Sequence, residues 1–155
     1  MQYDFQKGIV KQRIFEERKM ESKLIFQQYN EALKENRIMG LRCSNCRETI
    51  FPAKILCPQC GSNNLDPIQL KNSGIVCTFT TNYIPAESRE AEVPYVIVIV
   101  ELDDGPWIMG NLTGIAPDQV TMKVIGQRVS MVGAKVFPGD KYSNGELARP
   151  LFQLL

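Results

Sequence analysis

The sequences Cys43-Ser-Asn-Cys46 and Cys57-Pro-Gln-Cys60, separated by ten residues, determine how this 155-residue chain folds. Each Cys-x-x-Cys knuckle brings two sulfur atoms to one side of a tight turn, and two knuckles can surround one metal ion. The residues around them are polar and rich in Pro, Asn and Ser, so they cannot build a hydrophobic core alone. We therefore predict a tetrahedral metal site with Cys43, Cys46, Cys57 and Cys60 as its ligands.

The predicted metal has a structural role, because four thiolate ligands leave no open coordination position. We expect zinc. Iron is a second possibility, since Cys57-Pro-Gln-Cys60-Gly61 is rubredoxin-like, and two redox disulfides are a third. Arg47 stands where the second knuckle has Gly61, and a charge beside the cluster disfavours a tuned electron-transfer site.

The residues before the knuckles predict helix. From residue 9 to residue 36 the chain has no Pro or Gly and repeats apolar residues at helical spacing, as in Phe26, Tyr29 and Leu33. We expect one long helix or two shorter ones. The thin apolar stripe is compatible with a helix docked on its own domain and equally with a helix that binds a partner.

The residues after the knuckles predict a small β-barrel. Five strands are expected, over residues 68–83, 95–102, 107–112, 128–137 and 147–154, with turn-forming Gly, Pro, Asp and Asn between them. A long first strand that bends into both halves of a barrel, with an interrupting segment near 114–125, is typical of an OB-fold. Another small barrel or a sandwich is the alternative.

Alternation within the first of these strands places Ile75, Cys77 and Phe79 on one face, with Val76 and Thr78 on the other. We interpret Cys77 as a small buried apolar side chain rather than a nucleophile. The whole sequence thus predicts a mainly β protein with N-terminal helices. A helical segment spans 1–39, a rubredoxin-like zinc ribbon spans 40–66, and an OB-fold barrel spans 67–155.

Composition excludes several classes of function. The chain has 18 Lys and Arg, 17 Asp and Glu and no His, for a formal net charge of +1. Without His it cannot assemble a Ser-His-Asp or Cys-His nucleophile or an imidazole metal site. Residues 66–155 carry 7 Lys and Arg against 10 Asp and Glu, so a polyanionic partner would approach the earlier part of the chain.

No targeting or membrane segment is expected. The N-terminal sequence MQYDFQKGIV contains Asp4 and Lys7 and has no apolar stretch of signal-peptide length. The longest apolar run, Tyr95 to Val100, is far shorter than the roughly 18 residues that suggest a membrane span. We expect a cytoplasmic protein that does not contact a membrane.

The order of helix, knuckles and small barrel resembles the acyl-CoA-associated zinc-ribbon/OB-fold family, long catalogued as a domain of unknown function. The resemblance covers residues 26–155. Its motifs, in chain order, are Phe26 to Leu33 before Gly40-Leu-Arg-Cys43, the two knuckles, Ser73-Gly74-Ile-Val-Cys-Thr-Phe-Thr80, Pro94-Tyr95 leading into Val98-Ile-Val-Glu101, Ile125-Gly126-Gln-Arg-Val129 and Arg149-Pro-Leu-Phe152.

The resemblance implies a scaffold role. Members of that family look like non-catalytic partners of thiolases, of hydroxymethylglutaryl-CoA synthase and of related acyl-CoA enzymes of lipid metabolism. Such a member bridges catalytic subunits and helps to enclose the pantetheine arm of a CoA thioester. This chain departs from the family pattern in its extended helical N-terminus and in lacking the usual Gly after the first knuckle.

A CoA-binding surface needs cations for the nucleotide end and an apolar or aromatic slot for the arm. The candidates for the cations are Arg42, Arg47 and Lys54 in the ribbon. The candidates for the slot are Phe79, Tyr83 and Trp107 in the barrel, although each of these also suits a core.

Nucleic-acid binding is the alternative function, because zinc ribbons and OB-folds both occur in proteins that bind nucleic acids. Against it, residues 83–94 contain Glu87, Glu90 and Glu92 with only Arg89 as a cation, and these carboxylates would repel a phosphate chain. Independent catalysis is disfavoured, because the sequence offers no nucleophile with a base, no open metal position and no phosphate-binding loop.

Overall fold

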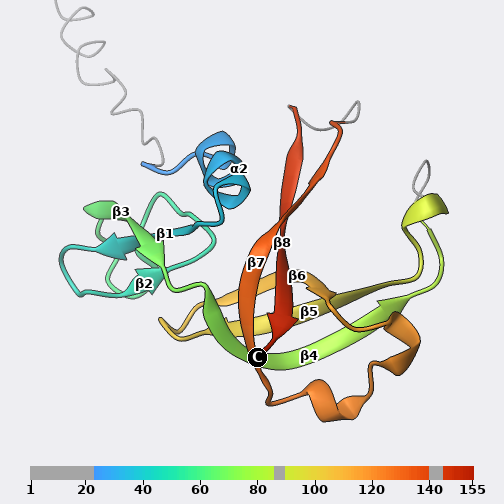
Figure 1. Ribbon diagram of the computed structural model, residues 1–155. Helices are drawn as coiled ribbons and strands as arrows, with labels where there is room; N and C mark the ends of the chain where they lie inside the picture. Colours follow the sequence, from blue (N-terminus) through green and yellow to red (C-terminus); the bar gives the residue numbers. More distant parts are fainter. Residues whose placement is uncertain (1–22, 86–89, 140–144) are drawn as a thin grey trace, which may run out of the picture.

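The computed structural model describes residues 23–85, 90–139 and 145–155, which form a mostly β protein with one short α-helix (Figure 1). This confirms the predicted fold class. The elements are the helix α2 (Phe26–Lys34), the ribbon strands β1 (Ile38–Cys43), β2 (Thr49–Ile50) and β3 (Leu65–Leu70), the barrel strands β4 (Ser73–Asn82), β5 (Tyr95–Leu102), β6 (Trp107–Thr113), β7 (Arg128–Phe137) and β8 (Leu147–Leu154), and the short 3-10 turns η2 (Glu90–Glu92), η3 (Pro117–Gln119) and η4 (Met122–Val124).

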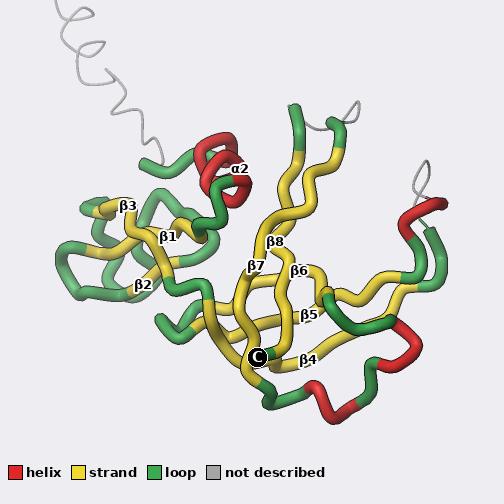
Figure 2. Tube along the Cα trace, in the orientation of Figure 1, coloured by secondary structure: helices red, strands yellow, loops and turns green. Residues whose placement is uncertain are grey.

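The five C-terminal strands close into a barrel in the order β4-β5-β6-β8-β7 (Figure 2). Neighbouring strands are antiparallel except β6 and β8, which are parallel. Between β6 and β7 the chain runs through η3 and η4, along the lower edge of the barrel in Figure 1. A five-stranded barrel with this connectivity is the predicted OB-fold.

The barrel is filled by the inward side of its alternating strands. Along β5, Val96, Val98, Val100 and Leu102 are all buried, and Phe152 of β8 is fully buried beside them in the same cluster. Burying each such side chain contributes about 1.5–3 kcal/mol. The other side of β5 and β6 therefore faces away from the core, and its residues are available for contacts outside the barrel.

Strand β4 departs from the predicted alternation at Cys77. The register between β4 and β5 shifts between Val76 and Thr78, which leaves Cys77 in a β-bulge. Because a bulge adds one residue, the side chains after it change faces. Val76 is buried and Phe79 packs against the same core, whereas Ile75 is exposed. The predicted grouping of Ile75 with Phe79 was therefore wrong, and Cys77 is half-buried rather than buried.

The strand predicted over 68–83 is two strands that belong to different sheets. Strand β3 pairs with β1 in the ribbon, in the order β2-β1-β3, whereas β4 begins at Ser73 and belongs to the barrel. The break falls at Lys71, whose backbone N–H donates a 2.5 Å hydrogen bond to Asp104 Oδ2. The prediction of a single strand was wrong because apolar residues occur on both sides of the break, where the chain leaves the ribbon sheet and enters the barrel. The ribbon sheet thus extends to Leu70, past the predicted junction at residues 66 and 67.

Helix α2 lies between the ribbon and the hairpin of β7 and β8 (Figure 1). Leu33 is fully buried in the barrel cluster, together with Ile38 and Leu70 of the ribbon sheet. The buried Asn30 side chain accepts a 3.0 Å hydrogen bond from the backbone N–H of Ala148. This helix is therefore docked on its own domain.

Only part of the predicted helical segment is helical in the described chain. The helix begins at Phe26, where the Gln28 side chain accepts a 3.1 Å hydrogen bond from the N–H of Ile25, and it ends at Lys34 before Asn36 takes a φ of +60°. Residues 23–25 are not helical, contrary to prediction. The prediction for residues 9–22 lies outside the described residues. No helix in the described chain is long and apolar enough to cross a membrane.

Candidate metal centre and adjoining grooves

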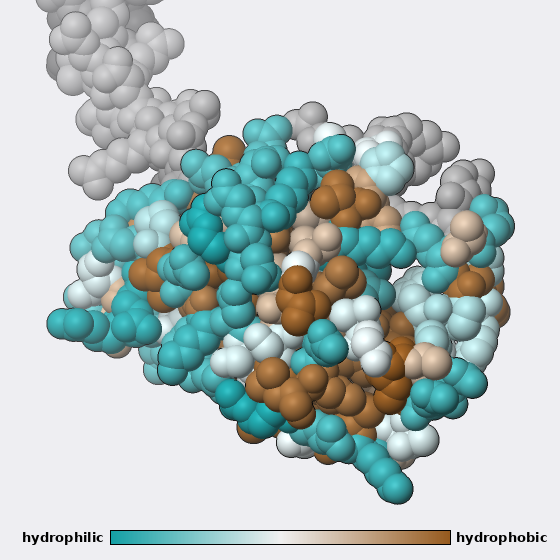
Figure 3. Space-filling model, in the orientation of Figure 1, coloured by the Kyte–Doolittle hydropathy of each residue, from teal (hydrophilic) through white to brown (hydrophobic). Residues whose placement is uncertain are grey.

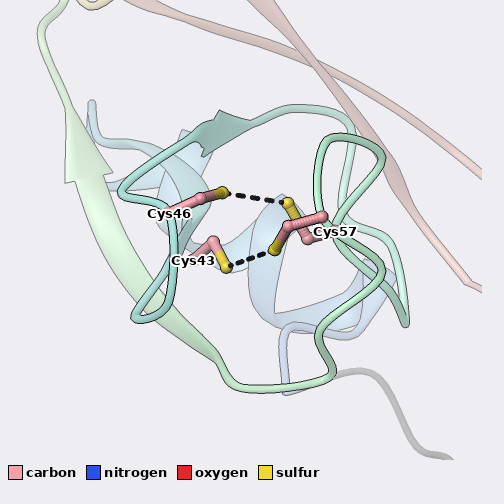
Figure 4. A group of neighbouring side chains, drawn as sticks. Cys43, Cys46 and Cys57 are labelled. Atoms are coloured by element: carbon pink, nitrogen blue, oxygen red, sulfur yellow. Dashed lines mark hydrogen bonds between the residues drawn. The ribbon is translucent and has the colours of Figure 1, made fainter.

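The four predicted cysteines converge at one end of the ribbon. Cys43 ends β1, Cys46 follows it in the first turn, and Cys57 comes from the second turn (Figure 4). Cys60 lies in the second turn as well. The Sγ atoms of Cys43 and Cys60 are 3.6 Å apart, and those of Cys46 and Cys57 are 3.5 Å apart. All four sulfurs lie within 4.8 Å of one another.

This geometry fits a tetrahedral ion. With Zn–S bonds of about 2.3 Å, the sulfurs of a tetrahedral site are about 3.8 Å apart, close to the separations found here. Iron bound by four thiolates has the same tetrahedral geometry. The residues present would hold the ion with four sulfurs and leave no position for substrate, as the sequence predicts.

The backbones of the two knuckles repeat one hydrogen-bond pattern. The N–H of Arg47 donates to the carbonyl of Cys43, and the N–H of Gly61 donates to the carbonyl of Cys57, each at 2.9 Å. A 2.9 Å bond from the N–H of Ser44 to the carbonyl of Asn64 ties the two turns together. Backbone pairing thus fixes the direction in which each sulfur points.

The electrostatics of the cluster require a cation. Hydrogen bonds from the Ser62 backbone and the Asn45 side chain lower the pKa of Cys60 to about 6. At Cys46 a hydrogen bond from the Glu48 backbone acts in the same direction, but desolvation and the neighbouring sulfurs raise the pKa to about 12. A positive ion would therefore be needed for Cys46 to ionise beside Cys60, because it offsets the repulsion between the two sulfurs.

Two of the three predicted cationic residues lie together. Arg42 and Arg47 line one shallow pocket of about 310 Å³, and Lys54 does not line it. Asp66 lines the same pocket and receives hydrogen bonds from Ser44 and Lys23, which lower its pKa. An anion bound between the arginines would therefore face a carboxylate as well.

The three predicted aromatic residues differ in their exposure to solvent. Phe79 packs against the barrel core. Tyr83 follows β4 and is 64% exposed, and Trp107 begins β6 and is 60% exposed. The structure thus leaves Tyr83 and Trp107 accessible to solvent and places Phe79 inside.

A larger apolar groove lies between α2 and the ribbon, where sequence analysis proposed no site. Its volume is about 390 Å³, which is in the range of small-molecule pockets. Tyr29 and Phe51 stand side by side in it, with ring centroids 5.6 Å apart. The lining residues are Leu24, Ile25, Phe26, Tyr29, Met39, Phe51, Pro52 and Ala53, and we call this the α2–ribbon groove.

One hydroxyl group lies in this apolar groove. Tyr29 is half-buried, and burial raises the pKa of its phenol well above the ordinary value. The hydroxyl makes no hydrogen bond to another side chain or backbone group in the described part of the chain. The spacing of Phe26 and Tyr29 was visible in the sequence, but their proximity to Phe51 depends on the tertiary fold.

The fold and the sulfur cluster define a metal-ribbon and OB-fold protein. Residues 31–66 match the family model for the ChsH2 rubredoxin-like zinc ribbon domain, and residues 68–134 match that for the ChsH2 C-terminal OB-fold domain. A DUF35 domain-containing scaffold protein of Pyrococcus furiosus is 33% identical over 105 residues, 68% of this chain and 74% of that protein. The chain belongs to the DUF35 family, as the sequence resemblance predicts.

Two further similarities are to proteins whose names include an enzyme. A probable enoyl-CoA hydratase alpha subunit of Thermomonospora curvata is 36% identical over 90 residues, 58% of this chain and 28% of that protein. The solved structure titled Ltp2-ChsH2(DUF35) aldolase matches with a TM-score of 0.63 and 29% identity, covering 86% of this chain and 98% of that one. The matches to the DUF35 scaffold protein and to the Ltp2-ChsH2(DUF35) structure support a scaffold or accessory role.

Proposed function

We propose that this protein is a non-catalytic scaffold subunit of an acyl-CoA enzyme complex. It bridges enzymes of the thiolase or hydroxymethylglutaryl-CoA synthase type and helps to enclose the pantetheine arm of their CoA thioesters. The α2–ribbon groove is the observation that carries this proposal. Relatives that are named scaffold proteins, and a similar chain from an aldolase structure, support it.

The groove has the chemistry that a pantetheine arm requires. The arm is long and uncharged, with dimethyl-substituted carbon and two amides, so it needs apolar walls and a few hydrogen-bonding groups. The groove supplies apolar walls and the Tyr29 hydroxyl, which can donate to an amide carbonyl. Lys54 follows the lining residue Ala53 in the chain and is exposed, so its ammonium group is available to the phosphates of the nucleotide end.

A structural metal fits this role better than a catalytic one. The four sulfurs complete the coordination of zinc, and the cluster is the only group of three or more potential ligands found in the described ranges. In this proposal the zinc holds the ribbon strands in place, and the ribbon strands in turn hold Met39 and Phe51 against α2. The chemistry then belongs to the partner enzymes.

Nucleic-acid binding is the weaker proposal. The exposed Trp107 suits base stacking, but Glu101 is its cross-strand partner and the η2 turn adds Glu90 and Glu92. A phosphate chain on this face would meet these carboxylates.

The first test is the composition of the native complex. The tagged full-length protein is purified gently from its own cell, and its stoichiometric companions and metal content are measured by mass spectrometry. We expect a thiolase-type or synthase-type enzyme with about one zinc per chain. Recovery of nucleic acid or ribonucleoprotein without an acyl-CoA enzyme would overturn the proposal.

The second test measures, by calorimetry, the binding of pantetheine to the full-length protein or to its complex. Tyr29→Phe removes only the hydroxyl and should weaken binding roughly 3- to 10-fold, the effect of one hydrogen bond. Tyr83→Phe removes the same atom from a side chain that is 64% exposed outside the groove and should change nothing. Equal affinities for wild type and both variants would exclude the groove as the site.

A further inference from the structure

The outside of the barrel carries an apolar surface that the proposed function does not use. Cross-strand pairs place Ile99 opposite Met109 and Ile97 opposite Asn111 on strands β5 and β6. Met109 is 50% exposed and Trp107, two residues before it on the same face, is 60% exposed. Ile75 of β4 continues this surface. We call Ile75, Ile97, Ile99, Trp107 and Met109 the outer barrel face.

An unpaired carboxylate lies at one end of this face. Glu101 of β5 is the cross-strand partner of Ile75 on β4 and of Trp107 on β6, so it lies between them. It is exposed, and its carboxylate has no ion pair or hydrogen bond with any residue that the structure describes. The carboxylate therefore stands between two apolar side chains and has no salt-bridge partner among the described residues, since Arg128, the next residue across β4, pairs with Asp103.

A guanidinium without a carboxylate partner among the described residues lies at the other end. Arg149 of β8 is half-buried, with its guanidinium carbon 5.0 Å from the centre of the Phe137 ring. Among the described residues its guanidinium donates a hydrogen bond to Asn111 Oδ1, at 3.4 Å. The neighbouring Lys135 pairs with Glu92, but Arg149 has no carboxylate partner in the described ranges. Most of its five donors are thus available to an incoming acid.

We infer that the outer barrel face is a two-fold contact between two copies of this chain, in which Glu101 of each copy pairs with Arg149 of the other. A surface that binds its own copy about a two-fold axis must be self-complementary. This face meets that requirement, because it has an apolar centre with an acid at one end and a base at the other. Each end of one copy supplies the charge that the opposite end of the other copy lacks.

The dimer leaves the proposed ligand site open. The outer barrel face shares no residue with the α2–ribbon groove. Helix α2 packs on the other side of the β7–β8 hairpin, where Asn30 meets the backbone of Ala148 rather than the side chain of Arg149. The inference therefore does not depend on the proposed function, and either can fail without the other.

Sedimentation equilibrium of the purified full-length protein over a range of concentrations tests the inference. We expect a reversible monomer–dimer equilibrium. Glu101→Lys and Arg149→Glu should each weaken dimerisation at least tenfold, because each places like charges opposite one another at two symmetry-related positions. The double variant restores both pairs in reversed sense and should recover most of the lost affinity.

A third variant and a control distinguish a loss of dimerisation from a folding defect. Trp107→Ser changes a 60% exposed side chain and should also weaken the dimer at least tenfold while circular dichroism is unchanged. Glu48→Lys makes the same charge change as Glu101→Lys on an exposed ribbon residue and should have no effect on dimerisation. A monomer at every concentration, or a dimer that tolerates both Trp107→Ser and Glu101→Lys, would overturn the inference.

Discussion

Arg47 and Gly61 occupy equivalent positions behind the two knuckles and share one backbone conformation, with φ values of +67° and +72°. In this left-handed region a side chain crowds the backbone, at a cost of roughly 1–2 kcal/mol for most residues. The pattern of hydrogen bonds is the same at both positions, so the first knuckle folds like the second. Arg47 is less suited than Gly61 to the left-handed backbone conformation that this fold requires.

Arg47→Gly should therefore stabilise the zinc-loaded protein by about 0.5–1 kcal/mol, since relief of strain exceeds the added entropy of the unfolded chain. Urea unfolding at fixed zinc measures this. Gly61→Ala is the reciprocal variant and should destabilise by about 1 kcal/mol, because a Cβ at Gly61 would meet no atom within 4 Å and only the backbone strain is added. A destabilised Arg47→Gly would indicate that the arginine side chain contributes more than its backbone costs.

Removal of the metal, or Cys57→Ser, should unfold the ribbon and leave most of the barrel intact. Structural zinc contributes on the order of 10–16 kcal/mol of apparent folding energy to small ribbons, whereas the barrel core is built from its own strands. Circular dichroism should retain most of its β signal while the partner complex is lost. If the partner complex still assembled after verified loss of the metal, the folded ribbon would not be needed for the scaffold role.

Stability should fall in acid through a carboxylate that joins β4 to β7. Hydrogen bonds from Arg128 and Ser73 lower the pKa of Asp103 to about 2. Because its pKa in the folded state lies below that in the unfolded state, Asp103 stabilises the protein above about pH 4 and loses this effect as the pH falls toward 2. In urea unfolding, Asp103→Asn should be less stable at pH 7 and should approach wild type near pH 2. Thiolate protonation affects both proteins and cancels in the difference.

Asn30→Ala should destabilise the protein by about 1–3 kcal/mol, because it leaves the backbone N–H of Ala148 without its acceptor. Thermal unfolding measures the loss. Gln27→Ala is a matched control, because Gln27 is an exposed amide on the same helix. Equal effects of the two substitutions would show that α2 is not held on β8 by this bond.

The metal site and most strands could be predicted from the sequence because their signals are local. The spacing of Cys43 to Cys46 and of Cys57 to Cys60 specifies two turns that each converge on one ion, whatever the rest of the chain does. Alternation along Tyr95–Leu102 likewise specifies one buried face.

The features that could not be predicted depend on partners distant in the chain. The bulge at Cys77 appears only in the pairing of β4 with β5, and the break after Leu70 appears only when β3 pairs with β1. The α2–ribbon groove needs Tyr29 beside Phe51, two residues in separate elements that no spacing rule connects. Such features follow from the tertiary fold.

Figure 3 shows hydrophobic side chains gathered over the lower barrel, whose five strands form a closed order. Strand β5 pairs with β4 on one side and with β6 on the other along nearly its whole length, so another chain cannot join β5 by adding a strand. Recognition along β5 must therefore come from side chains alone. Surface residues such as Trp107 and Glu101 can therefore be substituted without altering the barrel backbone. Such substitutions would change which partner protein the barrel binds.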